Sequence, residues 1–99
     1  MMLKVLRISG ESLSPEYRNG DYVVVSRFWT KPVSGDAIVF QNKIYGTMIK
    51  KTQSILESGD FFVIGSDPKS VDSRRFGAVN RKDVIGKVIW HIRKSADHI

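Results

Sequence analysis

The feature that most constrains the fold is one turn signal that occurs three times in the chain. Each copy is a Gly-Asp pair preceded by Asn or Ser, and four apolar residues, largely β-branched or aromatic, follow it at once. Gly and Asp favour tight turns, and a short apolar run after a turn is typical of a buried strand. The turns and their strands are residues 19–21 with 22–25, 34–36 with 37–40, and 58–60 with 61–64. The unequal spacing excludes a regular solenoid, and the pattern predicts a mainly β protein.

Other segments complete this pattern. We expect a first strand over residues 3–8 and a last strand over residues 84–92, both rich in β-branched residues. A turn at 41–43 is expected to lead into a strand over 44–51, and Ser14 with Pro15 favours a single helical turn. On the last strand we expect Trp90 to lie in the core and its neighbour His91 to face solvent.

Length and strand content together predict the architecture. The 99 residues suffice for one small domain and are too few for two. Several short strands, frequent Gly turns and almost no helical periodicity indicate a folded-over β barrel or sandwich. We therefore expect a single β domain over residues 1–93, with residues 94–99 as a polar tail.

Composition narrows the chemistry that the chain can perform. It has no cysteine, and its two histidines, His91 and His98, lie near the C-terminus, so a disulfide frame, a thiolate nucleophile and the usual zinc ligand sets are not expected. No cofactor is predicted. The net charge of +6 suits an anionic partner, although the basic residues are dispersed and give no firm evidence for nucleic acid. Without a signal peptide or a membrane-spanning run, we expect a soluble cytoplasmic protein, unless an anchor has been removed.

The candidate nucleophile is Ser12, which follows the first predicted strand. Gly10 and Pro15 flank it, and such a stiff turn exposes a side chain together with backbone N–H groups. The segment resembles the serine motif of the type I signal peptidase family, Gly-x-Ser-Met-x-Pro ahead of a Gly-Asp turn, with Leu13 where the family usually has Met. The resemblance implies that Ser12 attacks a peptide bond. It also implies an oxyanion hole made mainly of backbone N–H groups, those of Ser12 and Glu11.

A serine needs a general base, and Lys50 is the candidate. It follows the apolar pair Met48 and Ile49, and burial in apolar surroundings lowers the pKa of a lysine towards neutrality. If Lys50 faces inward, period-2 alternation turns Lys51 outward. The stretch resembles the family's apolar-Ile-Lys-Arg motif, which implies that Lys50 is the base and that Lys51 replaces the arginine.

A third segment, residues 65–77, resembles the family's closing motif Ser-x-Asp-Ser-Arg-x-x-Gly. The match implies that Ser70 hydrogen-bonds the lysine amine, and that Asp72 and Arg74 form an ion pair that braces the loop. These three residues are therefore predicted to support the dyad and not to perform the chemistry themselves.

Taken together, the chain resembles the signal peptidase family over most of its length, most closely the small anchorless members that mature nickel-type superoxide dismutase precursors. The resemblance implies a serine endopeptidase that cleaves a protein precursor or leader peptide held extended beside a strand edge. Two alternatives remain open, a LexA-like autopeptidase domain and a catalytically inactive β domain that binds an anionic partner. Phe28 and Trp29 are expected either to pack over the core or to contact a membrane interface or a substrate.

Overall fold

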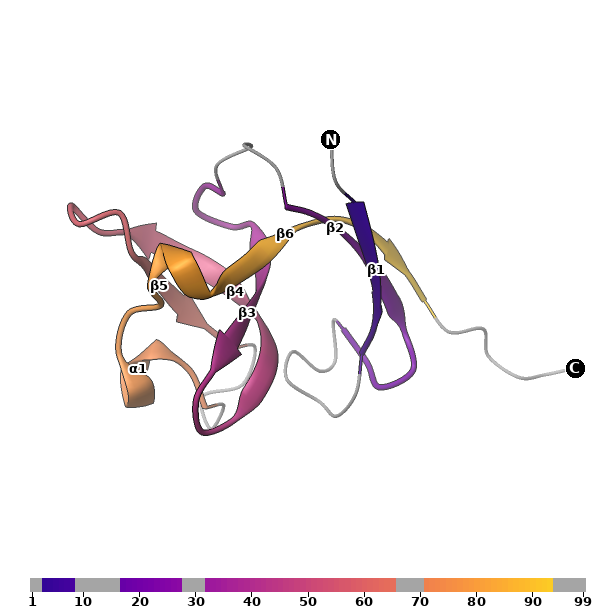
Figure 1. Cartoon of the computed structure of the whole chain (residues 1–99), viewed down its shortest axis with the longest axis horizontal. Helices are drawn as coiled ribbons and strands as arrows, with labels where there is room; N and C mark the ends of the chain where they lie inside the picture. Colours follow the sequence, from indigo (N-terminus) through magenta and orange to yellow (C-terminus); the bar gives the residue numbers. More distant parts are fainter. Residues whose placement is uncertain (1–2, 9–16, 28–31, 66–70, 94–99) are drawn as a thin grey trace, which may run out of the picture.

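A computed structural model describes residues 3–8, 17–27, 32–65 and 71–93. In this part of the chain all six strands belong to one antiparallel sheet, with the order β1-β2-β6-β3-β4-β5 (Figure 1). The mainly β architecture is as predicted. The elements are β1 (Leu3–Arg7), β2 (Tyr22–Ser26), β3 (Ala37–Asn42), β4 (Gly46–Ile55), β5 (Phe61–Ile64), a short helix α1 (Ser73–Phe76), a 3₁₀ turn η1 (Arg81–Asp83) and β6 (Val84–Ile92).

Strand β6 connects the two halves of the sheet. Its N-terminal part pairs with β3, and its C-terminal part pairs with β2, as the long yellow strand in Figure 1 shows. The two neighbours meet β6 at Gly86 and Lys87, where Val39 lies opposite Gly86 and both Ser26 and Ile38 lie opposite Lys87. The chain is therefore closely packed around the middle of β6.

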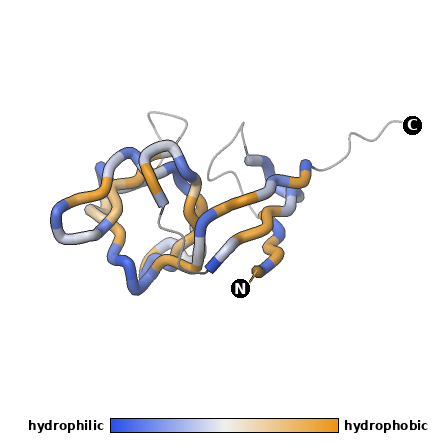
Figure 2. The backbone as a smooth tube through the Cα atoms, turned by 90° about the horizontal axis from the view of Figure 1, so that it is seen from above, coloured by the Kyte–Doolittle hydropathy of each residue, from blue (hydrophilic) through white to orange (hydrophobic). Residues whose placement is uncertain are grey.

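Among the residues that the structure describes, the hydrophobic core forms two clusters, and β3 contributes to both. Ala37 and Val39 belong to one cluster with residues of β2 and with Ile49 of β4. Ile38 and Phe40 belong to the other, with residues of β4 and β5. Successive side chains of a strand point to opposite faces, so β3 is buried on both. Hydrophobic stretches accordingly run through both halves of the molecule (Figure 2).

The hairpin between β3 and β4 differs from the prediction. Strand β3 extends through Asn42, and β4 begins at Gly46 and continues to Ile55, so the turn covers residues 43–45 and lies two residues further along than the predicted 41–43. The side chain of Asn42 accepts hydrogen bonds from the backbone N–H groups of Ile44 and Tyr45, at 2.8 and 3.0 Å. Such an Asx turn closes the loop locally, and Gly46, with φ of 81°, takes the left-handed conformation that starts the next strand.

The expected orientations of Trp90 and His91 were wrong. Trp90 is exposed, and His91 is largely buried and points to the inner side. The cause is a β-bulge: Val25 lies opposite Val88 and Val24 lies opposite Trp90, so β6 advances two residues where β2 advances one. One extra residue reverses the facing of every side chain beyond it.

Close packing at Gly86 leads to a stability prediction. A Cβ atom at this position would lie 2.5 Å from the backbone oxygen of Ser26 and 2.5 Å from a methyl group of Val25. Because the backbone cannot yield cheaply between two paired strands, Gly86→Ala should lower the free energy of unfolding by about 1–3 kcal/mol. Denaturant titration measures this change, and Gln53→Ala on an exposed part of β4 is the control, with little expected effect. An unchanged midpoint for Gly86→Ala would contradict the packing.

Candidate active site

Lys50 lies in the interior on β4, directly opposite Ile38 of β3. Only 2% of its surface is exposed, and its neighbours at alternate positions, Met48 and Thr52, are buried as well. Loss of water around the ammonium lowers the pKa of Lys50; the nearby Asp72 carboxylate partly opposes this shift, and Arg74 adds to it. The inward orientation expected for Lys50 is therefore confirmed, and Lys51 is partly exposed.

Asp72 is a buried carboxylate with a full set of hydrogen-bond donors. Arg74 donates to it from Nε at 2.9 Å and from its terminal nitrogen at 2.6 Å, which forms the predicted ion pair. The backbone N–H groups of Gly65 and Arg74 donate at 2.9 and 3.1 Å. Burial by itself would raise the pKa of Asp72, but these hydrogen bonds outweigh it and lower the pKa to about 2. The carboxylate is thus held ionised beside Lys50.

The segment that carries Asp72 is fixed to β5 by a residue that the sequence analysis did not single out. Ser73 accepts a hydrogen bond at its Oγ from the backbone N–H of Val63, at 2.9 Å. Asp72 also caps the N-terminus of α1, and Phe76 at the end of this helix packs against Phe40 of β3. Ser73 is the second serine of the Ser-x-Asp-Ser-Arg motif, to which the sequence analysis gave no role, and its contact with β5 becomes visible only in the fold.

The predicted nucleophile lies outside the described residues, as do Glu11, Ser70, Phe28 and Trp29. The chain on either side of the Ser12 segment is described. Ile8, just before the segment, exchanges two backbone hydrogen bonds with the turn that follows it: its N–H donates to Asp21 at 2.7 Å, and its oxygen accepts from Gly20 at 2.8 Å. The two chain ends that lead into and out of the Ser12 segment are therefore joined close to β1 and β2.

A histidine and an aspartate reinforce this junction, and neither was predicted to do so. His91 of β6 contacts the carboxylate of Asp21 at 2.7 Å. The His91 ring stacks on Tyr17, with ring centroids 4.4 Å apart. Asp21 also accepts a hydrogen bond from the backbone N–H of Arg18. These contacts attach the turn that follows the Ser12 segment to the inner side of β6.

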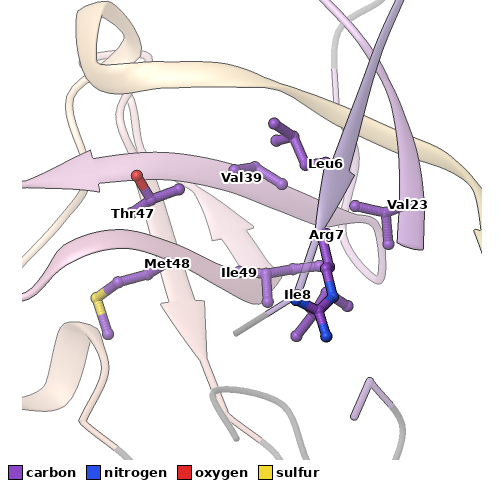
Figure 3. A pocket seen from close by; sticks show the side chains of 8 residues that line it. All are labelled: Leu6, Arg7, Ile8, Val23, Val39, Thr47, Met48 and Ile49. Carbon is purple, nitrogen blue, oxygen red and sulfur yellow. The ribbon is translucent and has the colours of Figure 1, made fainter. Parts of the chain in front are cut away.

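A small apolar pocket lies between β1 and β4 (Figure 3). Among the described strands, the first part of β4 pairs with β3 alone, because β5 begins to pair only at Lys51. Strand β1 likewise pairs only with β2 in this part of the chain. The pocket therefore lies beside two strand edges that are open to a further strand. Its lining residues are Leu6, Arg7, Ile8, Val23, Val39, Thr47, Met48 and Ile49.

No helix in the described part of the chain is long and apolar enough to cross a membrane. Over the same residues, no three side chains of His, Cys, Asp or Glu come together where they could hold a metal ion.

Comparison with known protein families gives one match. A family model described as Peptidase S24-like matches residues 2–89. The matched range includes Ser12, Lys50 and the segment over residues 65–77. Comparison with curated proteins gave no match.

Burial of Lys50 should have a measurable cost. The pKa of Lys50 is lowered in the folded state, so the unfolded chain binds the proton more readily and the penalty is present at pH values below the folded pKa. Lys50→Met should therefore raise the free energy of unfolding at neutral pH, by on the order of 1 kcal/mol. This gain should shrink as pH rises towards the ordinary lysine range, because wild-type Lys50 then loses its proton. Denaturant titrations at several pH values test this. Lys43→Met at the exposed hairpin turn is the control, and a gain independent of pH would contradict the prediction.

The opposite pH dependence is expected for Asp72. Its lowered pKa contributes stability that is fully present above about pH 4 and is lost as pH falls towards 2. Asp72→Asn should lower the free energy of unfolding at pH 7 by about 2 kcal/mol, with the difference from wild type closing near pH 2. The exposed Asp83→Asn serves as the matched control. An equal loss at pH 7 and pH 2 would show that the charge of Asp72 does not stabilise the fold.

Proposed function

The chain belongs to the Peptidase S24-like family, and we propose that it is a serine endopeptidase that cleaves a protein precursor or leader peptide with a Ser12–Lys50 dyad. The observation that carries the proposal is Lys50. A lysine almost never lies fully buried without a specific reason, and this one has its pKa lowered by loss of water within a peptidase fold. A lysine in that state can accept a proton from a hydroxyl near neutral pH.

In the proposed mechanism the Ser12 Oγ attacks the carbonyl carbon of the substrate while Lys50 Nζ takes the hydroxyl proton. Collapse of the tetrahedral intermediate breaks the C–N bond, and Lys50 gives the proton to the leaving amine. Water activated by Lys50 then hydrolyses the acyl ester and restores Ser12. Backbone N–H groups of Ser12 and Glu11 are proposed to stabilise the oxyanion.

The supporting residues are assigned positioning roles. Ser70 is proposed to hydrogen-bond the Lys50 amine and so orient it. The ion pair between Asp72 and Arg74 supports this assignment, because it fixes Asp72, the N-cap of α1, two residues after Ser70 in the sequence. Loss of Ser70 should then lower activity by less than loss of Lys50.

The proposed substrate is an extended peptide lying between β1 and β4. Backbone hydrogen bonds to an open strand edge hold a peptide in register without reading much of its sequence. The pocket in Figure 3 offers an apolar site for one side chain of such a peptide. The segment just before Lys50 forms one wall, so a peptide bound there would approach the proposed base.

Self-cleavage is the second candidate, because the same dyad can act on a segment of its own polypeptide and the family match is equally compatible with it. Self-cleavage and cleavage of a separate precursor differ in how the cleavage rate depends on protein concentration. Cleavage within one polypeptide proceeds at a rate independent of dilution, whereas processing of a separate precursor requires encounter. A tagged Ser12→Ala chain mixed with wild type reports cleavage between molecules directly.

The dyad predicts a sharp mutational result. Wild-type protein incubated with a mixture of small precursor proteins should generate new N-termini, identified by mass spectrometry. Ser12→Ala and Lys50→Ala should each lower the cleavage rate by about three orders of magnitude or more, because each removes a group that takes part in bond making. The matched controls are Ser9→Ala, in the same segment, and Lys51→Ala, on the outward side of the same strand; both should retain cleavage.

Two outcomes would contradict the dyad. Substantial turnover in either single variant, with the fold intact by circular dichroism, would remove that residue from the mechanism. An activity that still climbs near pH 10, where an ordinary lysine titrates, would show that Lys50 does not act as a base with a lowered pKa.

A further inference from the structure

One face of the β1, β2 and β6 part of the sheet is apolar and exposed. It is the outer face, opposite the core cluster that contains Val23 and Val25. The strand register aligns its side chains in rows: Val5 lies opposite Val24, which lies opposite Trp90. The apolar residues of this outer face are Leu3, Val5, Tyr22, Val24, Trp90 and Ile92.

A water-exposed sheet face normally carries polar side chains, so this face calls for an explanation. Trp90 is 67% exposed and Val5 is 61% exposed, and they lie in the same row on two strands of the sheet. Contiguous exposed apolar surface of this kind marks an interaction site. The bulge that turned Trp90 outward enlarges the face.

Basic side chains lie at the ends of the outer face, and the ion pair between Lys87 and Asp36 is the acidic contact found beside it among the described residues. Arg27 follows the end of β2 and Arg93 follows the end of β6, so an exposed arginine lies beyond each end of this strand pair. Exposed Arg7 adds positive charge on β1, in the same row as Tyr22. The sequences of the three strands contain no Asp or Glu, and the nearby Asp21 is buried against His91.

The combination of an apolar face and basic margins favours one kind of binding partner over another. Face-to-face pairing of two copies would bring two basic margins together, which like-charge repulsion disfavours. An anionic lipid bilayer offers an apolar interior beneath a negative surface, and Trp and Tyr are enriched where those two layers meet. We propose that the outer face of β1, β2 and β6 docks on an anionic lipid surface, with Trp90 and Val5 entering the interfacial layer.

The docking proposal does not depend on the proposed peptidase activity. The two share β1, which contributes Val5 to the outer face and Leu6 to the pocket on the other side.

The test is flotation of the full chain with vesicles of phosphatidylcholine, with and without phosphatidylglycerol. We expect binding to the anionic vesicles only, and a loss of about tenfold or more in affinity for the double variant Val5→Ser with Trp90→Ser. Ile44→Ser is the matched control, because Ile44 is even more exposed but lies on the hairpin between β3 and β4. Arg27→Gln with Arg93→Gln should weaken binding at least fivefold, as should added salt.

Each other result overturns the proposal. Absence of binding to anionic vesicles does so directly. Binding that Val5→Ser with Trp90→Ser leaves unchanged would reflect net charge alone. A dimer seen by sedimentation in place of vesicle binding, and abolished by the same double variant, would assign the outer face to a second copy. Circular dichroism of every variant separates these outcomes from unfolding.

Discussion

The candidate site depends on the hydrogen bonds and the ion pair that the buried carboxylate of Asp72 forms. A lone ionised group in the interior would be strongly unfavourable, and here Arg74 and two backbone N–H groups supply the donors that make it stable. Those donors come from the end of β5 and from α1, so satisfying one charge also joins two segments. Removing any of these donors would leave the buried carboxylate with too few hydrogen bonds. The positions of the two segments that supply the donors are therefore strongly constrained.

The same carboxylate limits how far the pKa of Lys50 is lowered. Burial acts to remove the proton from Lys50, and the negative charge of Asp72 acts to retain it; burial is the larger effect. Arg74 neutralises much of the Asp72 charge through its ion pair, which leaves burial less opposed. The ion pair thus has two consequences, one for the position of the closing segment and one for the proton affinity of the lysine. A neutral residue at position 72 would change both at once.

Much of the strand arrangement could be predicted because the Gly-Asp turns are local signals. The strands after Asp21, Asp36 and Asp60 begin where the turn chemistry placed them. The facing of Trp90 and His91 could not be predicted, because it depends on a bulge between β6 and β2, and the partner strand is distant in sequence. The contact between Asp21 and His91 spans 70 positions and is invisible to any local pattern. The inward position of Lys50 followed from its apolar neighbours, whereas the roles of Ser12 and Ser70 remain predictions.

Strands β2 and β3 share one sequence pattern but differ in how many of their faces are buried. Each follows a Gly-Asp turn and begins with four apolar residues, which by itself predicts a strand buried on both faces. Residues 37–40 of β3 meet that expectation, because both core clusters pack against it. In β2 only Val23 and Val25 reach a core cluster, and Tyr22 points outward and is exposed. The outward residues of β2 are therefore apolar without a covering layer in the described part of the fold. The sequence of β2 is thus typical of a strand that is covered on both faces, yet its outward apolar residues are exposed. Exposed apolar surface of this kind is typical of a face that binds a partner.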